Sequence, residues 1–141
     1  MSDPGEPMQE APPAHAGLRV LLIDDHAMVL QAMRNLVEVD GHRVSVCDSG
    51  LKGIGMFQDA LAQGMPFDVV ITDFGMPGMD GGEVARRVKL ASPATRVVML
   101  TGWGPAVDAS DDWKSHVDLF LGKPPRLAEV RRVLAGARGA P

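Results

Sequence analysis

The 141-residue chain is poor in cysteine and aromatic residues and lacks a long hydrophobic run. Its single cysteine, Cys47, excludes an internal disulfide, and the apolar stretch Val44-Ser45-Val46 before it predicts a buried, unreactive thiol. No apolar stretch approaches the roughly 20 residues that span a bilayer, so we expect no membrane association. The net charge of −4 gives no basic surface for nucleic acid. A soluble protein with a cytoplasmic location is the default expectation.

The first sixteen residues differ in composition from the rest of the chain. They contain four prolines among Gly, Ala and Glu and no hydrophobic periodicity, which predicts a disordered arm at 1–16. The arm has no apolar core segment and no basic leader, so it does not resemble a signal peptide. The rest suits one domain, placed at 17–136 and followed by a short tail at 137–141. Because this tail is short, we expect no output domain.

Short β-branched runs alternate with segments of helical period from Leu18 onward. Five such runs predict strands at about 18–24, 43–48, 67–73, 96–101 and 118–122. Helices are expected between and after them, and strict alternation of five strands with five helices indicates the α/β class. Near-continuous apolar strands, such as Val69-Val70-Ile71, predict a parallel sheet covered by helices on both faces.

The predicted helices differ in the strength of their signals. The first has apolar residues at helical spacing and is closed by Gly41. The last is expected from Pro125 to Ala135, with Gly136 after it. The fourth, around 104–113, has few apolar residues, so we expect a short or poorly held helix. Its expected anchors are Val107, Trp113 and Val117.

Polar side chains stand at the carboxyl ends of four predicted strands. They are Asp24 and Asp25 after the first, Asp73 after the third, Thr101 after the fourth and Lys123 after the fifth. Because parallel strands end at one edge of the sheet, where α/β proteins bind ligands, these groups are expected to meet in one crevice.

The chemistry of this set favours a divalent metal and a phosphoryl group. Three carboxylates repel one another unless a cation joins them, and Mg²⁺ prefers oxygen ligands. A carboxylate beside such an ion can attack a phosphoryl donor and form an acyl phosphate. Asp73 is the best candidate nucleophile, because it stands alone on the central run before a glycine-containing loop. The Thr101 hydroxyl and the Lys123 ammonium could hold the phosphoryl oxygens.

These motifs resemble the receiver domain of two-component response regulators, over about Leu18 to Ala135. The resemblance rests on Asp24-Asp25, Asp73-Phe74-Gly75-Met76-Pro77-Gly78-Met79-Asp80-Gly81, Thr101-Gly102 and Lys123-Pro124. The intervals also agree with the family, at 48 (25 to 73), 28 (73 to 101) and 22 (101 to 123) residues. The resemblance implies a flavodoxin-like, doubly wound sheet of five parallel strands in the order 2-1-3-4-5.

The resemblance also assigns roles to the residues of the crevice. It implies that Asp73 accepts phosphate from a phosphohistidine on a histidine kinase or histidine phosphotransfer protein. Asp25, Asp73 and the backbone carbonyl of Gly75 would bind Mg²⁺, with Asp24 supporting through water. Such a protein is a phosphoacceptor that assists its own phosphorylation and dephosphorylation, and not a turnover enzyme.

Thr101, Lys123 and Phe120 would respond to the phosphorylation state. Thr101 and Lys123 would contact the phosphoryl group, and Thr101 and Phe120 would then move inward. Phe120 lacks a hydroxyl and can report the switch only by packing. Gly75 and Trp103 stand at the two positions that tune phosphate lifetime in the family.

Three residues near these motifs are expected to act on the starts of the neighbouring helices. Asp80 is expected to cap the third helix. His26 is expected to begin the first helix with its ring toward solvent. Gly82 replaces a usual apolar residue and weakens the third helix by about 1 kcal/mol relative to Ala.

Signalling would proceed by protein contact. The expected surface is formed by the fourth helix, fifth strand and fifth helix, where Phe120, Trp113 and several arginines gather. The sequence leaves two alternatives undecided: a homodimer, and a receiver excised from a hybrid histidine kinase. A Mg²⁺-dependent phosphatase using Asp73 is a weaker alternative, because Gly75 cannot serve as its second acid or base. A degenerate binding scaffold is disfavoured by the intact set of polar residues.

Overall fold

The computed structural model describes residues 17–102 and 112–139 of the chain. Its sheet contains five strands, all paired in parallel, in the order β2-β1-β3-β4-β5. The predicted arm at 1–16 lies outside the described residues, as do Trp103 and Val107. The predicted class, sheet and strand order are thus confirmed.

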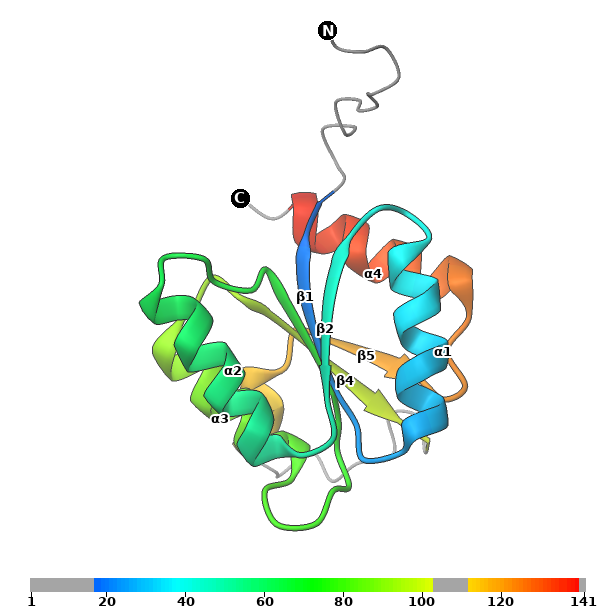
Figure 1. The fold of residues 1–141 in the computed structure, drawn as a ribbon. Coiled ribbons are helices and arrows are strands. Elements are labelled where there is room, and N and C mark those ends of the chain that lie inside the picture. The colour runs from blue at the N-terminus through cyan, green and yellow to red at the C-terminus, as the bar shows by residue number, and fades with distance from the viewer. Residues whose placement is uncertain (1–16, 103–111, 140–141) are drawn as a thin grey trace, which may run out of the picture.

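The strands and helices alternate along the chain, as the sequence pattern predicts (Figure 1). The strands are β1 (Arg19–Ile23), β2 (Arg43–Cys47), β3 (Val69–Asp73), β4 (Arg96–Thr101) and β5 (Leu119–Gly122). The helices are α1 (Ala27–Glu38), α2 (Gly50–Ala62), α3 (Gly81–Ala91), the 3-10 helix η2 (Asp112–His116) and α4 (Leu127–Gly139).

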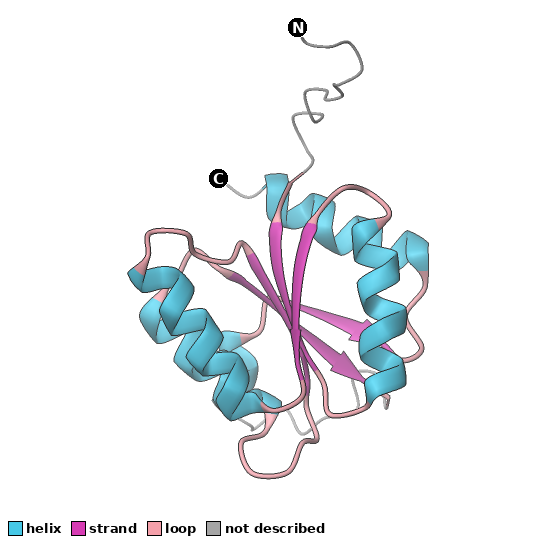
Figure 2. Ribbon diagram, viewed as in Figure 1, coloured by secondary structure: helices cyan, strands magenta, loops and turns pink. Residues whose placement is uncertain are grey.

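The helices cover the two faces of the sheet as separate layers (Figure 2). Alternate residues of β1 point to opposite faces: Leu21 joins the core cluster under α2 and α3, and Leu22 joins the cluster under α1 and α4. All five residues of the central strand β3 are buried. A strand covered on both faces buries both of its sides, which explains the apolar run Val69-Val70-Ile71 that precedes the polar Thr72 and Asp73.

Helix α1 follows the predicted pattern. Met33 and Val37 are buried against the sheet, and Val29 and Leu36 pack partly buried beside them. Gly41 adopts a φ of 87°, which costs an L side chain energy, and its amide donates to the Glu38 carbonyl at 3.0 Å. The predicted role of Gly41 at the end of this helix is confirmed.

The last helix differs from its predicted bounds. It begins at Leu127 instead of Pro125, because the first helical hydrogen bond runs from the Val130 amide to the Arg126 carbonyl at 2.9 Å. It also continues through Gly136 to Gly139. A glycine inside a helix costs only about 1 kcal/mol, and buried Val133 and Leu134 hold this helix to the sheet.

Most of the predicted fourth helix, around 104–113, lies outside the described residues. Among the described residues between β4 and β5, the 3-10 helix η2 is present. Trp113 and Val117 pack against the α2–α3 core cluster, as predicted.

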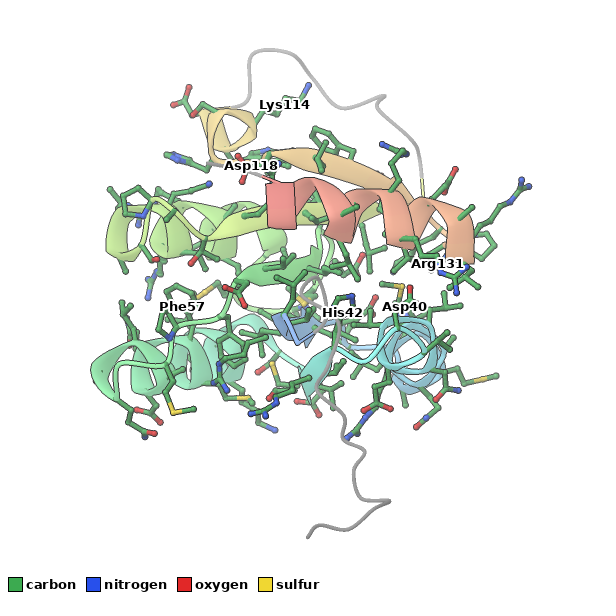
Figure 3. The ribbon with its side chains drawn as sticks, turned by 90° about the horizontal axis from the view of Figure 1, so that it is seen from above. Asp40, His42, Phe57, Lys114, Asp118 and Arg131 are labelled. Carbon is green, nitrogen blue, oxygen red and sulfur yellow. The ribbon has the colours of Figure 1, made fainter. Side chains whose placement is uncertain are left out.

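Helices α1 and α4 are joined at one end by an ion pair. Arg131 donates to Asp40 through Nε at 2.8 Å and Nη2 at 3.0 Å, and Figure 3 shows the two residues side by side. The pair is bidentate but exposed, so we expect only a small contribution to stability.

Candidate active site

Side chains from three strand ends meet at the carboxyl edge of the sheet. Lys123 Nζ, just after β5, lies 2.9 Å from Asp73 Oδ1 at the end of β3. It also lies 3.0 Å from Asp24 Oδ2, just after β1. The ammonium therefore bridges two carboxylates from neighbouring central strands, as the strand-end pattern predicts.

Thr101 belongs to the same crevice. It ends β4, its backbone carbonyl accepts from the Lys123 amide at 3.0 Å, and its side chain is buried. Thr101, Gly75 and Asp73 line one cavity of about 80 Å³. The structure thus brings the predicted hydroxyl and the glycine loop to the carboxylate expected to react.

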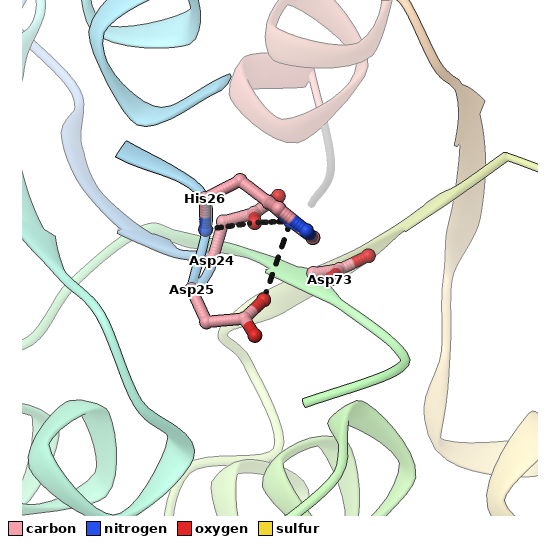
Figure 4. A group of neighbouring side chains, drawn as sticks. All are labelled: Asp24, Asp25, His26 and Asp73. Atoms are coloured by element: carbon pink, nitrogen blue, oxygen red, sulfur yellow. Dashed lines mark hydrogen bonds and ion pairs between the residues drawn. The ribbon is translucent and has the colours of Figure 1, made fainter. Parts of the chain in front are cut away.

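The acidic residues form a group with the geometry of a cation site (Figure 4). Asp24, Asp25, His26 and Asp73 each offer one ligand atom, and these atoms lie within 4.8 Å of one another. Asp24 is only 1% exposed, and its Oδ2 accepts no hydrogen bond from the described residues. Its contact with Lys123 is close enough for an ion pair but lacks hydrogen-bond alignment.

The charge of this group fits a divalent ion. Three carboxylates and one ammonium leave a formal charge of −2 at neutral pH. A buried oxygen without a hydrogen bond costs free energy that a bound cation can recover. Oxygen donors of this kind suit a hard ion such as Mg²⁺.

Burial and neighbouring charges shift the pKa values of Asp73 and Lys123. Burial raises the pKa of Asp73, and the nearby Asp24 carboxylate raises it further, while the hydrogen bond from Lys123 opposes both. Burial alone would lower the pKa of Lys123, but its bonds to Asp73 and Asp24 outweigh that effect and raise it. Lys123 therefore stays charged at neutral pH.

His26 takes part in the site, which the sequence reading missed. Its backbone amide donates to Asp24 Oδ1 at 2.9 Å, and its Nδ1 lies 3.0 Å from the same oxygen. The ring is 63% exposed, as predicted, yet it also lies 3.3 Å from Asp25. Aspartate side chains often accept a hydrogen bond from the backbone amide two residues later, and this preference could have predicted the contact between Asp24 and the His26 amide.

The start of α3 packs closely against the end of β3. The Gly81 amide donates to the Phe74 carbonyl at 2.8 Å, and a Cβ at Gly81 would collide with the Asp73 carbonyl oxygen. Asp80 caps the helix, as predicted, by accepting from the Glu83 amide at 2.9 Å. Glycine at 81 is therefore required by close approach.

Three aromatic rings line the outer side of the site. Trp113 lies 4.8 Å from Phe74 and 6.2 Å from Phe120, measured between ring centroids. Phe120 is 36% exposed. Gly82, the departure noted in the sequence, is buried directly against the Trp113 side chain.

The family model of the response regulator receiver domain matches residues 20–135. The chain belongs to this family. Receiver domains of this family act in two-component signal transduction, and the resemblance predicted from the motifs is confirmed.

Individual relatives agree with this assignment. The virulence sensor protein BvgS of Bordetella pertussis is 39% identical over 97 residues, which is 62% of this chain. The chain spans only 7% of BvgS.

Solved receiver structures share the fold. One from Clostridium thermocellum is 30% identical with a TM-score of 0.76, and the match covers 86% of this chain and 94% of that one. The receiver domain of a Pseudomonas aeruginosa sensor histidine kinase also has a TM-score of 0.76, at 21% identity, covering 89% of this chain and all of the other, 100%. That structure holds a magnesium ion in its active-site cleft.

None of the helices in residues 17–102 and 112–139 is both long and apolar enough to cross a bilayer.

Proposed function

We propose that this receiver takes a phosphoryl group from a phosphohistidine onto Asp73 and passes the signal on by protein contact. The observation that carries the proposal is the convergence of Asp73, Asp24 and Lys123 within 3.0 Å ion pairs at one sheet edge. An isolated aspartate at a strand end has no such cation and no second carboxylate beside it.

The metal site would be formed by Asp25, Asp73 and the Gly75 carbonyl, with Asp24 supporting through water. When bound, Mg²⁺ neutralises the negative charge that would otherwise repel an incoming phosphoryl group. The oxygen donors, the −2 charge and the unbonded Asp24 oxygen support this assignment. So does the magnesium ion of the Pseudomonas receiver, which has the same fold.

The chain's own residues carry out the transfer. An Asp73 carboxylate oxygen attacks phosphorus, so an O–P bond forms while the P–N bond of the phosphohistidine breaks and its electron pair returns to the imidazole nitrogen. Lys123, now 2.9 Å from Asp73, stays positive and pairs with a phosphoryl oxygen. The buried Thr101 hydroxyl donates to another phosphoryl oxygen.

Partners follow from this chemistry. The phosphate donor would be a histidine kinase or histidine phosphotransfer protein. The output surface would be formed by η2, β5 and α4, where Phe120 is exposed, and a homodimer could use the same surface. Similarity to the sensor BvgS supports an origin in a hybrid kinase as the alternative to a separate regulator.

A mass measurement tests the proposal. Incubation with acetyl phosphate and Mg²⁺ should add one phosphate to the protein, and the adduct should be absent in Asp73→Asn. Asp80→Asn is the matched control, because this carboxylate caps α3 and lies outside the acidic group. Turnover of many phosphomonoesters would instead support a phosphatase. No adduct from any small donor or kinase would support a binding scaffold.

A further inference from the structure

Trp113 connects the two sides of the proposed site. Its ring is tilted by 34° on Phe74, at 4.8 Å, and meets Phe120 edge to face at 64° and 6.2 Å. Such geometries are favourable for aromatic pairs. Phe74 follows Asp73 directly, and Phe120 stands three residues before Lys123. The ring of Trp113 therefore touches neighbours of both members of the central ion pair.

Helix α3 fixes the position of Trp113, because Gly82 leaves the space that the indole occupies. A Cβ built at Gly82 would lie 2.8 Å from Cγ and 2.9 Å from Cβ of Trp113. Contacts this short force a side chain to shift in a close-packed interior. Gly82 is buried, and Trp113 packs against the core cluster of α2 and α3. The small residue and the large one thus form a complementary pair.

The three rings also enclose the cavity next to the phosphoacceptor. Its volume is about 80 Å³, and its walls include Asp73, Thr101, Phe74, Trp113 and Phe120. Phe120 lines this cavity and is also 36% exposed, so it can be reached both from the site and from solvent. Because Trp113 contacts the rings of both Phe74 and Phe120, a movement of Phe74 changes the surroundings of Phe120 through the indole.

We propose that Trp113 is a positioning residue that couples Phe120 to the phosphorylation state of Asp73. The inference rests on the proposed phosphorylation of Asp73. Phe74 transmits the change to the indole, Gly82 holds the indole in place, and the edge contact passes the change to Phe120. This adds a third ring, seated on α3, to the switch pair of Thr101 and Phe120. Displacing the indole makes the surroundings of Phe120 independent of phosphate.

The test observes Phe120 directly through 4-fluorophenylalanine placed at position 120. Its ¹⁹F resonance is recorded before and after acetyl phosphate and Mg²⁺, with the phosphate adduct followed by mass. Gly82→Ala displaces the indole while removing no side chain. Gly55→Ala is the matched control, because a Cβ there meets nothing within 4 Å. All variants should gain phosphate, and the resonance should move in the parent and Gly55→Ala but stay fixed in Gly82→Ala.

A second variant separates coupling from a change in packing at α3. Trp113→Leu leaves Gly82 in place but removes the ring that contacts Phe74 and Phe120, so the phosphate-dependent shift should be lost there too. If Gly82→Ala keeps the full shift, Trp113 does not couple the two sites and the inference is wrong. If Gly82→Ala does not fold, Trp113→Leu takes its place, and an unchanged shift there has the same meaning. A parent protein that gains no phosphate overturns the proposed function and this inference with it.

Discussion

At the scale of single residues, Lys123 determines the balance of charge in the crevice. In the part of the chain that the structure describes, it is the one cation paired with both Asp24 and Asp73, and Asp25 lies beside the exposed His26. The ammonium therefore compensates part of the acidic group, and the remaining repulsion falls mainly on Asp25.

Removing the charge of Asp25 should consequently stabilise the metal-free protein. We expect Asp25→Asn to raise Tm without Mg²⁺, because one repelling carboxylate is lost. Saturating Mg²⁺ should stabilise the native sequence by about 1–3 kcal/mol and leave Asp25→Asn almost unchanged. Thermal unfolding with and without Mg²⁺ measures both effects. Asp59→Asn, on the surface of α2, is the control for net charge; equal Tm values throughout would contradict the prediction.

Cys47 gives a second prediction, on pH. Burial raises the pKa of its thiol to about 11, whereas an unfolded thiol titrates near 8.5. The folded state therefore holds its proton longer, so this stabilisation is complete below about pH 8.5 and is lost as pH rises toward 11.

The Cys47→Ala variant isolates this effect. The difference in unfolding free energy between the native protein and Cys47→Ala should shrink by about 2–3 kcal/mol between pH 8.5 and 11. Urea unfolding across this range measures it, and the other titrating groups cancel in the comparison. A constant difference would show that the thiol titrates normally in the folded protein.

The sequence predicts the polar residues of the site because parallel strands end at one edge. Position along the chain is then enough to place Asp24, Asp73 and Lys123 together. It cannot reveal that Trp113 occupies the space left by Gly82, because those residues lie 31 positions apart (82 to 113) and meet only in the folded chain.

At the scale of elements, the beginning of α3 combines two requirements. Gly81 permits close approach to Asp73, and Asp80 supplies the cap that offsets two glycines in the first turn. Glu83 pairs with Arg86 and Arg87, and those bonds lower the pKa of its carboxyl to about 2. These exposed ion pairs add a small stabilisation to that of the cap.

Loss of the cap gives a third prediction. Asp80→Ala should lower the free energy of unfolding by about 1 kcal/mol, because the Glu83 amide loses its acceptor. Asp80→Ser, which keeps a capping oxygen, should retain most of the stability that the cap contributes. Urea unfolding compares the two, and equal losses would mean that the cap contributes nothing to stability.

The sequence pattern predicts where the helices lie better than where they begin and end. The apolar spacing places α1 and α4 correctly, but Pro125 and Gly136 do not mark the ends of α4. Tertiary packing of Val130 and Leu134 overrides the local signals, since burial outweighs the cost of one interior glycine.

At the scale of the whole molecule, the sheet separates two core clusters. One lies under α2 and α3 and the other under α1 and α4, with β1 and β3 contributing to both. Alternating strands and helices of sufficient apolar content predict the two covered faces, whereas the strand order was expected from the resemblance.

The strand order also predicts how the site responds to partial unfolding. β5 pairs only with β4, whereas β1 and β3 each have two partners. Mild urea should release β5 first, so the rate of phosphorylation by acetyl phosphate should fall at lower urea than the circular dichroism of the whole fold. Arg131→Ala, which loosens α4 without touching the site, should widen that gap. Coincident transitions would show that β5 unfolds only with the rest.

The contacts of Lys123 with Asp24 and Asp73 also connect the site to the edge of the sheet. The carboxylates of the crevice come from the best-protected interior strands, but their only paired ammonium among the described residues stands just beyond an edge strand. A protein that binds β5 strongly enough to pull it from the sheet would withdraw this counter-charge and leave the acids intact. Binding of β5 in this way would remove the ammonium that pairs with Asp73 and leave the Asp73 side chain in place.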